Sequence, residues 1–329
     1  MVNILMLSKW HVHSPDYARM LGEQPDAKIT CVWDDDAERG RSWAQELGAD
    51  FVEDLDAALA RADVDAVVVD APTSDHLRVI LKAINAKKHV FTEKAMAPTV
   101  KECRQIEKAV KESGVKFCVS LPHVTLPLVQ YCKQAIDEGL LGDITYMRMR
   151  LSHDGSSRGW LPEYWYDTEK ACGGAMMDLG CHPMYSASYL LGKPKRVAAM
   201  FNTICCPPPA EDNAVTVVEF ENNALAVLET SFVSPYSSGC FELLGTKGAI
   251  VQTGREVRIR SAKNPEGWLI PNKLPPALPI TLRFWLDGIE NGAELPMFTP
   301  ERGTALTELL ENAYRSHKEQ IIVAIDGEQ

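Results

Sequence analysis

The segment at residues 89–94 combines an apolar run with two charged residues. Val90 and Phe91 lead through Thr92 into Glu93 and Lys94. Lysine and glutamate are rarely buried unless they are paired. In an open α/β sheet, ligands bind at the carboxyl ends of the strands. The pair is therefore either a solvated strand end or part of an active site, and other residues must decide between the two.

A second candidate is the carboxylate and imidazole of Asp178 and His182, in the segment that begins at Gly173 and Gly174. Residues four apart on a helix share a face and can interact. A carboxylate beside an imidazole orients the ring and raises its basicity, as an acid/base histidine requires. Such a pair is usually a contact on a helix surface. Here the flanking residues are small or apolar, which favours a buried, functional pair.

The loop after the first expected strand should carry a dinucleotide fingerprint, G-x-G-x-x-G. Its three glycine positions instead hold Ser8, Trp10 and His13. The helix that follows can still attract an anion through its free N–H groups and dipole. Asp34 ends the second strand about 20 residues later, where a carboxylate binds ribose hydroxyls. It is either that acceptor or a solvated strand end. With Asp35 and Asp36 beside it, the site favours NAD over NADP.

Other polar residues carry weaker signals. His11 and His13 with Asp16 resemble a metal cluster. The two histidines alternate on an expected extended loop, however, and the residues do not supply a complete set of ligands, so no metal site is predicted. The histidines are expected to line the cofactor or substrate mouth. Aromatic and polar side chains in the second half suit a sugar, although ordinary packing would also explain them. These candidates are His123, His153, Trp160, Tyr164 and Trp165.

The elements that must position these residues differ between the two parts of the chain. Up to residue 121, short apolar strands alternate with amphipathic helices, which predicts βαβ units and a parallel sheet. The expected strands are 4–7, 28–33, 66–69, 89–91 and 116–119, and the expected helices begin at 14 and span 37–47, 75–86 and 99–113. We therefore predict a dinucleotide-binding Rossmann domain over residues 1–121.

Residues 122–329 are predicted to form an α+β domain for substrate binding and oligomerisation. Consecutive strand-like runs indicate an open mixed or antiparallel sheet. These runs are 144–151, 197–202, 214–219, 224–231, 240–244, 249–252 and 256–259, and helices are expected over 125–138, 174–191 and 300–318.

Composition excludes some partners and compartments. The 329 residues carry a net charge of −11, which disfavours nucleic acid and anionic membranes. The nine cysteines have no zinc or C-x-x-C spacing, which predicts reduced thiols and a cytoplasmic protein. No apolar run is long enough for a signal peptide or a membrane span.

The order of three segments, 65–76, 88–94 and 173–182, resembles the glucose–fructose oxidoreductase/inositol dehydrogenase (Gfo/Idh/MocA) family over most of the chain. The resemblance implies a Rossmann domain that binds NAD(P), followed by an α+β domain whose open sheet covers the active site and commonly mediates dimers or tetramers. It also implies reversible hydride transfer at a secondary carbinol of a sugar or cyclitol. Two further departures from the family pattern are Ala95 in place of proline and Trp165-Tyr166 in place of a Trp-Arg pair.

The resemblance also implies roles for particular residues. Lys94, Asp178 and His182 match the catalytic positions, and Asp178 and His182 are also expected to bind substrate. His123, Trp160 and Trp165 are expected beside them from their side-chain chemistry alone. The resemblance implies Pro72, Thr73, His76, Glu93 and Lys94 as cofactor-binding residues, and the positions after the first two strands add Ser8, Trp10, His11 and Asp34.

The chemistry divides these roles further. An imidazole is better matched than an ammonium to accept a proton near neutral pH, so His182 is assigned as general acid/base and Asp178 as its orienting partner. Lys94 is assigned to position the hydroxyl and relay its proton, although the roles of Lys94 and His182 could be exchanged.

Three functions follow, in this order of preference. The first is an NAD-dependent sugar or polyol dehydrogenase that works as a homodimer or homotetramer. The second is an NAD-dependent glycosidase that oxidises, eliminates and reduces again with a tightly held cofactor. The third is a non-catalytic relative that binds a nucleotide or a sugar; the lost glycines favour it, whereas Lys94, Asp178 and His182 count against it.

Overall fold

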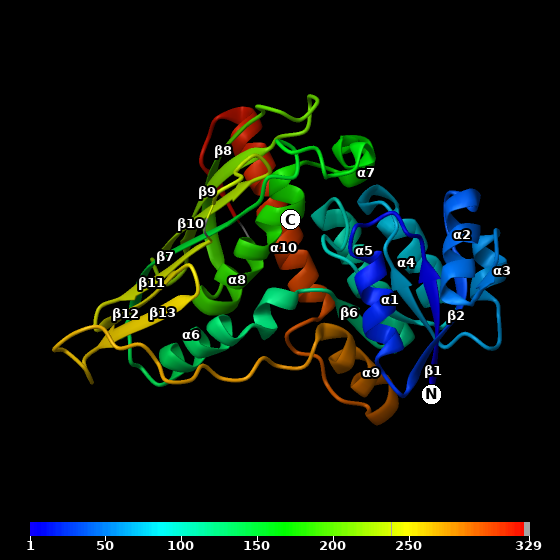
Figure 1. The fold of residues 1–329 in the computed structure, drawn as a ribbon, viewed down its shortest axis with the longest axis horizontal. Coiled ribbons are helices and arrows are strands. Elements are labelled where there is room, and N and C mark those ends of the chain that lie inside the picture. Colours follow the sequence, from blue (N-terminus) through cyan, green and yellow to red (C-terminus); the bar gives the residue numbers. More distant parts are fainter. Residues whose placement is uncertain (238, 326–329) are drawn as a thin grey trace. The chain divides into compact units, whose positions relative to one another are not determined.

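Six short strands form a parallel sheet in the order β3-β2-β1-β4-β5-β6, within the first of two units of the chain (Figure 1). The computed structural model describes residues 1–237 and 239–325. Unit 1 comprises Met1–Leu121 and Pro279–Thr307, and unit 2 comprises Pro122–Leu278 and the chain from Glu308 onward. The strand order reverses between β1 and β4, the switch point at which doubly wound sheets bind ligands.

The elements of unit 1 follow the expected alternation. They are β1 (Val2–Leu7), α1 (Ser14–Gly22), β2 (Ala27–Trp33), α2 (Ala37–Leu47), β3 (Asp50–Phe51), α3 (Leu55–Leu59), β4 (Ala66–Val69), the 3-10 turn η1 (Thr73–Asp75), α4 (His76–Asn85), β5 (His89–Thr92), α5 (Val100–Ser113), β6 (Phe117–Val119) and α9 (Thr281–Asn291). All four residues of β4 are buried, as expected for a central parallel strand. α5 begins with a capping box between Thr99 and Glu102 and ends at Gly114 with φ 73°.

The segment 279–307 groups with unit 1, whereas the sequence analysis assigned it to the second domain. Trp285 of α9 is fully buried, and its ring lies 5.7 Å from that of Phe91 in β5. The backbone N–H of Val119 donates to the carbonyl oxygen of Phe298 at 2.9 Å. The sequence analysis predicted no helix over 281–291, and its packing against this sheet was not foreseen because that packing joins segments far apart in the sequence.

Unit 2 is built on an eight-stranded sheet in the order β13-β12-β11-β7-β10-β9-β8-β14. β10 pairs with β7 in parallel, and the neighbouring pairs are antiparallel, so the sheet is mixed. α8 packs against β7 and β10. The predicted fold class, a Rossmann sheet followed by an α+β domain with a mixed sheet, is confirmed.

The elements of unit 2 are η2 (Pro122–Thr125), α6 (Pro127–Asp137), β7 (Ile144–Ser152), η3 (Glu163–Tyr166), α7 (Thr168–Ala171), the π-helical turn η4 (Met176–Gly180), α8 (Cys181–Leu191), β8 (Pro194–Asn202), β9 (Asn213–Phe220), β10 (Leu225–Ser231), β11 (Cys240–Gly245), β12 (Gly248–Thr253), β13 (Glu256–Ser261) and β14 (Val323–Ala324). α10 (Pro300–Glu319) begins in unit 1 and ends in unit 2. Within residues 1–237 and 239–325, no helix has the length and apolar character to span a membrane.

Candidate active site

The carboxyl end of β5 places Glu93 and Lys94 inside unit 1. Glu93 is 1% exposed and Lys94 is 2% exposed, and the Lys94 Nζ lies 3.8 Å from Glu93 Oε1. A buried ion pair stabilises little unless other contacts compensate for its lost hydration. Perturbed, buried ionisable groups at a ligand-binding edge are typical of functional sites. The burial of both residues excludes the interpretation as a solvated strand end and leaves the interpretation as part of an active site.

Glu93 is held by a network from two other elements. Tyr17 of α1 donates its hydroxyl hydrogen to Glu93 Oε2, and the Tyr17 Oη lies 2.6 Å from Ser120 Oγ. Burial first, and then the Glu93 charge, raise the pKa of Tyr17 well above its ordinary value. Burial pushes the pKa of Glu93 up, but His11, His13 and Lys94 outweigh it and hold that pKa below its ordinary value. Glu93 is therefore an ionised carboxylate that faces a protonated phenol.

Asp70 is a second buried acid, at the carboxyl end of β4. It is 0% exposed, and neither carboxyl oxygen has a well-formed hydrogen bond among the described residues. Burial and the Glu93 charge raise its pKa well above the ordinary value, which a weaker contact with Ser14 only partly opposes. Burial and the neighbouring Glu93 charge therefore both favour the protonated form of the Asp70 carboxyl group.

The loop at residues 8–13 follows β1 and is held by hydrogen bonds from its own backbone N–H groups. Ser8 has φ 76°, the left-handed conformation that glycine adopts most easily. The N–H groups of Lys9, Trp10 and His11 donate to Asp34 Oδ2, Ser8 Oγ and the Asp70 carbonyl oxygen, at 2.8, 3.2 and 3.1 Å. The N-terminus of α1, with its dipole, remains suited to a phosphate. The three loop N–H groups are therefore already paired within unit 1, and Trp10 is only 2% exposed, so contacts of Ser8, Trp10 and His11 with a dinucleotide stay predictions.

Asp34 lies at the end of β2 as expected, but its carboxylate turns inward. Its side chain is 0% exposed, and it accepts hydrogen bonds from Arg39 Nε at 3.0 Å and Nη2 at 2.5 Å. Burial raises the pKa of Asp34, but hydrogen bonds from Arg39, Asp36 N–H and Lys9 N–H outweigh it and lower that pKa. Asp34 therefore organises this edge of the sheet, and its binding of a ribose stays a prediction.

The imidazole of His76 lies between the residues that follow Lys94 and the loop after β4, and its ring nitrogens contact carbonyl oxygens of both. Its Nδ1 lies 2.9 Å from the carbonyl oxygen of Ala95, and its Nε2 lies 3.0 Å from that of Ala71. The Lys94-Ala95 peptide bond is cis. Pro72 directly precedes η1 and Thr73 begins it, 5% exposed. These contacts make His76 a positioning residue. Direct contacts of Pro72, Thr73 and His76 with the cofactor stay predictions.

In unit 2, His182 belongs to a cluster of rings. Its Nδ1 lies 2.7 Å from the hydroxyl oxygen of Tyr185, and its ring stacks on that of His123 with 4.4 Å between centroids. Tyr185 Oη in turn accepts the backbone N–H of His123 at 3.0 Å. The tyrosine hydroxyl therefore fixes both the imidazole and the backbone beside it.

Asp178 lies in the π-helical turn η4, whereas the sequence predicts a single α-helix over 174–191. Glu211 holds the start of this turn: its Oε2 accepts the Gly174 N–H at 3.0 Å, and its Oε1 accepts the Met176 N–H at 2.9 Å and the Tyr314 hydroxyl at 2.7 Å. A Cβ at Gly174 would lie 2.2 Å from the carbonyl oxygen of Glu211, so only glycine fits there. The catalytic roles of Asp178 and His182 stay predictions.

The expected sugar-contacting residues differ in exposure. Trp160 is 54% exposed and donates its indole N–H to Asp154, whereas Trp165 is only 4% exposed. His153 stacks on Phe232 with 4.8 Å between ring centroids. Trp160 is therefore available to a ligand, whereas Trp165 is almost fully buried.

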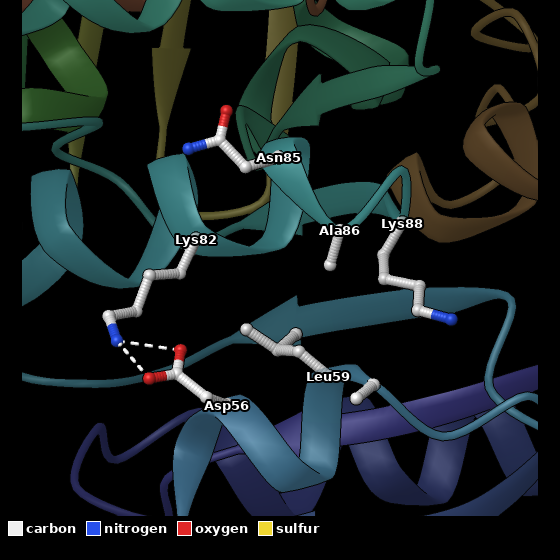
Figure 2. Close-up of a pocket in the computed structure, with 7 residues that line it drawn as sticks. Asp56, Leu59, Lys82, Asn85, Ala86 and Lys88 are labelled. Carbon is white, nitrogen blue, oxygen red and sulfur yellow. Dashed lines mark hydrogen bonds and ion pairs between the residues drawn. The ribbon is translucent and has the colours of Figure 1, made fainter.

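A surface hollow of about 490 Å³ in unit 1 lies away from these groups (Figure 2). Leu59 of α3 and Ala86 after α4 line it, and Lys82 donates to both carboxylate oxygens of Asp56 at 2.6 Å. Lys88, also in its lining, precedes β5, so the hollow belongs to the amino end of that strand. Its charged residues are paired, and it offers no catalytic constellation.

Sequence reasoning did not identify several residues that organise the site. They are Tyr17, Arg39, Asp70, Ser120, Tyr185, Glu211 and Tyr314. Each acts on a residue distant in sequence or through a hydrogen bond that residue type alone does not reveal. The short spacing of Tyr185 from His182 is the one signal that could have been used, because residues three apart on a helix are neighbours.

Two family models match the chain. Residues 12–121 match the oxidoreductase family with an NAD-binding Rossmann fold, and residues 129–251 match the GFO/IDH/MocA C-terminal domain. Together they cover most of both units.

Individual relatives agree with the family models. The chain is 30% identical to scyllo-inositol 2-dehydrogenase (NAD(+)) of Bacillus subtilis over 92% of this chain and 90% of that protein. It is 31% identical to 2,7-anhydro-N-acetylneuraminate hydratase of Escherichia coli over 71% of this chain and 63% of the hydratase, less than two thirds of that relative's length. The crystal structure of GenD2 from gentamicin A biosynthesis, in complex with NAD, superposes with TM-score 0.84 at 25% identity, covering 99% and 96% of the two chains. The chain therefore belongs to the Gfo/Idh/MocA family of oxidoreductases, and its first unit carries the NAD-binding Rossmann domain of that family.

Proposed function

We propose that this protein is an NAD-dependent dehydrogenase that oxidises a secondary carbinol of a sugar, sugar derivative or cyclitol. The observation that carries the proposal is the burial of Lys94 beside an ionised Glu93 at the carboxyl end of β5. Membership of an oxidoreductase family with an NAD-binding domain supports it. The similarity to an inositol dehydrogenase over nearly the whole chain suggests the substrate class.

The proposed chemistry divides among three side chains. NAD, when bound, supplies the nicotinamide carbon that accepts the hydride. His182 takes the hydroxyl proton, and the Tyr185 hydroxyl on its Nδ1 holds the ring in place. Lys94 positions the hydroxyl and relays its proton, and Asp178 binds substrate and orients His182.

The proposal also covers the oligomeric state, the cellular location and the partners of the protein. Exposed apolar residues alternate with buried ones along the second sheet, and a homodimer or homotetramer would cover them; they are Met200, Val215, Val217 and Leu225. Nine free cysteines suit a reducing, cytoplasmic location. The net charge of −11 argues against a nucleic-acid partner.

A second candidate function is favoured by the similarity to a hydratase that acts on an anhydro sugar. In that case the protein would oxidise its substrate, eliminate or add across a bond, and reduce again. NADH would not accumulate, whereas the sugar product would.

The test is an assay of purified protein with NAD⁺ against cyclitols, aldoses and anhydro sugars, followed by absorbance of NADH and by chromatography of the sugars. The dehydrogenase predicts NADH in a one-to-one ratio with oxidised product. Lys94→Ala should abolish turnover, and Lys108→Ala, at a lysine that is 75% exposed on α5, should not. Product without NADH would favour the second function, and Lys94→Ala with unchanged activity would contradict both.

A further inference from the structure

The loop at residues 11–13 brings two imidazoles together. The sequence analysis expected His11 and His13 to alternate on an extended loop, and this is wrong because the chain turns there. His13 has φ −85° and ψ −9°, and the Ser14 N–H and hydroxyl both donate to the His11 carbonyl oxygen, at 3.1 and 2.7 Å. The two rings consequently lie 4.6 Å apart between centroids.

Glu93 adds a carboxylate to this pair. One ligand atom from each of His11, His13 and Glu93 lies within 4.8 Å of the other two. The His13 Nδ1 is 3.4 Å from Glu93 Oε2. Two ligands bound about 2.1 Å from a tetrahedral zinc ion lie roughly 3.4 Å apart, so this separation already suits coordination. Asp16, which the sequence placed beside the histidines, is instead exposed and paired with Arg19.

Burial and charge also suit a cation. His11 and Glu93 are 4% and 1% exposed, whereas the His13 side chain is 36% exposed and leaves the cluster open on one side. The Glu93 Oε1, although 3.8 Å from the Lys94 ammonium, has no hydrogen-bond partner among the described residues. A buried carboxylate oxygen in this state gains from a metal ion, which would supply the contact that it lacks.

The surroundings give the carboxylate a fixed orientation. Tyr17 of α1 donates its hydroxyl hydrogen to Glu93 Oε2. Hydrogen bonds of this kind to a ligating carboxylate orient it and tune the affinity of a site for metal.

We propose that His11, His13 and Glu93 bind a divalent first-row transition-metal ion at the carboxyl edge of the parallel sheet. Two imidazole nitrogens and one carboxylate oxygen are a donor set that zinc, iron(II) and related ions prefer over magnesium or calcium. Three protein ligands leave at least one coordination position for water or for an oxygen of a bound molecule. The site lies entirely within unit 1 and does not depend on the proposed dehydrogenase activity.

The test measures metal on the whole chain without cofactor or substrate. Protein is treated with chelator, dialysed, and titrated with ZnCl₂ by calorimetry, and bound zinc is counted by mass spectrometry. We expect one zinc per chain, and Co²⁺ in its place should give visible absorption bands of a nitrogen- and oxygen-coordinated site. Mg²⁺ serves as the hard-cation comparison and should not bind at equal concentration.

Variants separate this site from chance binding by other histidines. His13→Gln, at a half-exposed position that tolerates substitution, should weaken zinc binding by at least about 10-fold and remove the rise in unfolding temperature that zinc gives the parent protein. Glu93→Gln should also lose the zinc. His317→Gln, at an exposed histidine of α10, is the matched control and should keep it.

Three results would overturn the proposal. They are the absence of zinc binding at micromolar concentration, zinc affinity unchanged in His13→Gln, and preferential binding of Mg²⁺. Because none of these readouts uses NAD or a sugar, failure here leaves the proposed function standing, and the reverse also holds.

Discussion

His182 Nδ1 lies 2.7 Å from the hydroxyl oxygen of Tyr185, one helical turn further along α8. The same hydroxyl accepts the backbone N–H of His123, so the phenol links the ring to the neighbouring η2 turn. A ring fixed through Nδ1 presents Nε2 as its reactive nitrogen. The proposed acid/base function of His182 therefore rests on a tyrosine as well as on Asp178.

The first prediction concerns the pH dependence of oxidation. If His182 is the base, kcat/KM should rise with pH through a group that titrates near neutrality, because only the neutral imidazole accepts a proton. His182→Asn should remove that limb, and Tyr185→Phe should keep the limb but lower kcat. The matched control is Tyr189→Phe on the same helix. A limb that survives in His182→Asn would move the proton transfer to Lys94.

The second prediction concerns cofactor choice. Asp34, Asp35 and Asp36 place three acids at the end of β2, and Arg39 neutralises only one charge. This excess repels a 2′-phosphate, so NAD⁺ should bind at least about 10-fold more tightly than NADP⁺.

Asp35→Ser combined with Asp36→Ser should narrow the difference in affinity between NAD⁺ and NADP⁺, because it removes two negative charges. Serine is chosen because it retains the cap that Asp36 gives α2. Glu38→Gln, which removes a neighbouring exposed charge, is the control and should change the ratio less. Titration calorimetry with both cofactors measures the ratio, and equal affinities in the parent protein would contradict this prediction.

The third prediction concerns the segment that returns to unit 1. Arg283 of α9 donates to Asp26 at 2.7 Å, and this contact, against the opposing effect of burial, lowers the pKa of Asp26 to about 2. Arg283→Ala should lower the free energy of unfolding at pH 7 by about 1 kcal/mol, since the pair is partly exposed to solvent. Urea unfolding measures the change, and Arg19→Ala, on an exposed helix pair, should cost less.

The same variant has a defined pH dependence. The carboxyl of Asp26 titrates near 3.9 in an unfolded chain and at about 2 in the folded one. The stabilisation is therefore complete above about pH 4 and is lost as pH falls toward 2. The difference between the parent protein and Arg283→Ala should shrink over that interval, and a constant difference would show that the ion pair is not its source.

The fourth prediction concerns Glu211 as a positioning residue. Its two carboxylate oxygens accept the N–H groups of Gly174 and Met176, whereas a glutamine would offer one amide oxygen as acceptor and an NH2 group that donates. Glu211→Gln should reduce kcat more than KM while leaving the pH profile in place. Glu221→Gln, at an exposed glutamate, should change neither parameter. A shifted pH profile would instead give Glu211 a direct part in proton transfer.

The sequence predicted the fold well because its signals are local. Buried strands such as β4, and caps such as Thr99 and Gly114, depend on neighbours within a few residues. The return of α9 to the Rossmann sheet and the π-helical turn around Asp178 depend on packing between distant segments. No residue pattern within either segment reveals them.

The candidate site was predicted in its residue types more than in its contacts. Glu93 and Lys94 were identified from their place after a strand, and their burial supports that reasoning. Asp34 was expected to face a ribose, but Arg39, five residues later, draws its carboxylate inward. The turn that joins His11 and His13 was missed because a loop that departs from the glycine pattern offers no template for its backbone.

The measurement that tests the central claim most directly is a calorimetric titration of NAD⁺ into the purified protein, combined with NADH absorbance once a cyclitol or sugar is added. The account predicts one NAD⁺ per chain, NADH formed with substrate, and a Lys94→Ala variant that binds NAD⁺ but does not turn over. No binding of NAD⁺ at millimolar concentration, or full turnover by Lys94→Ala, would contradict it.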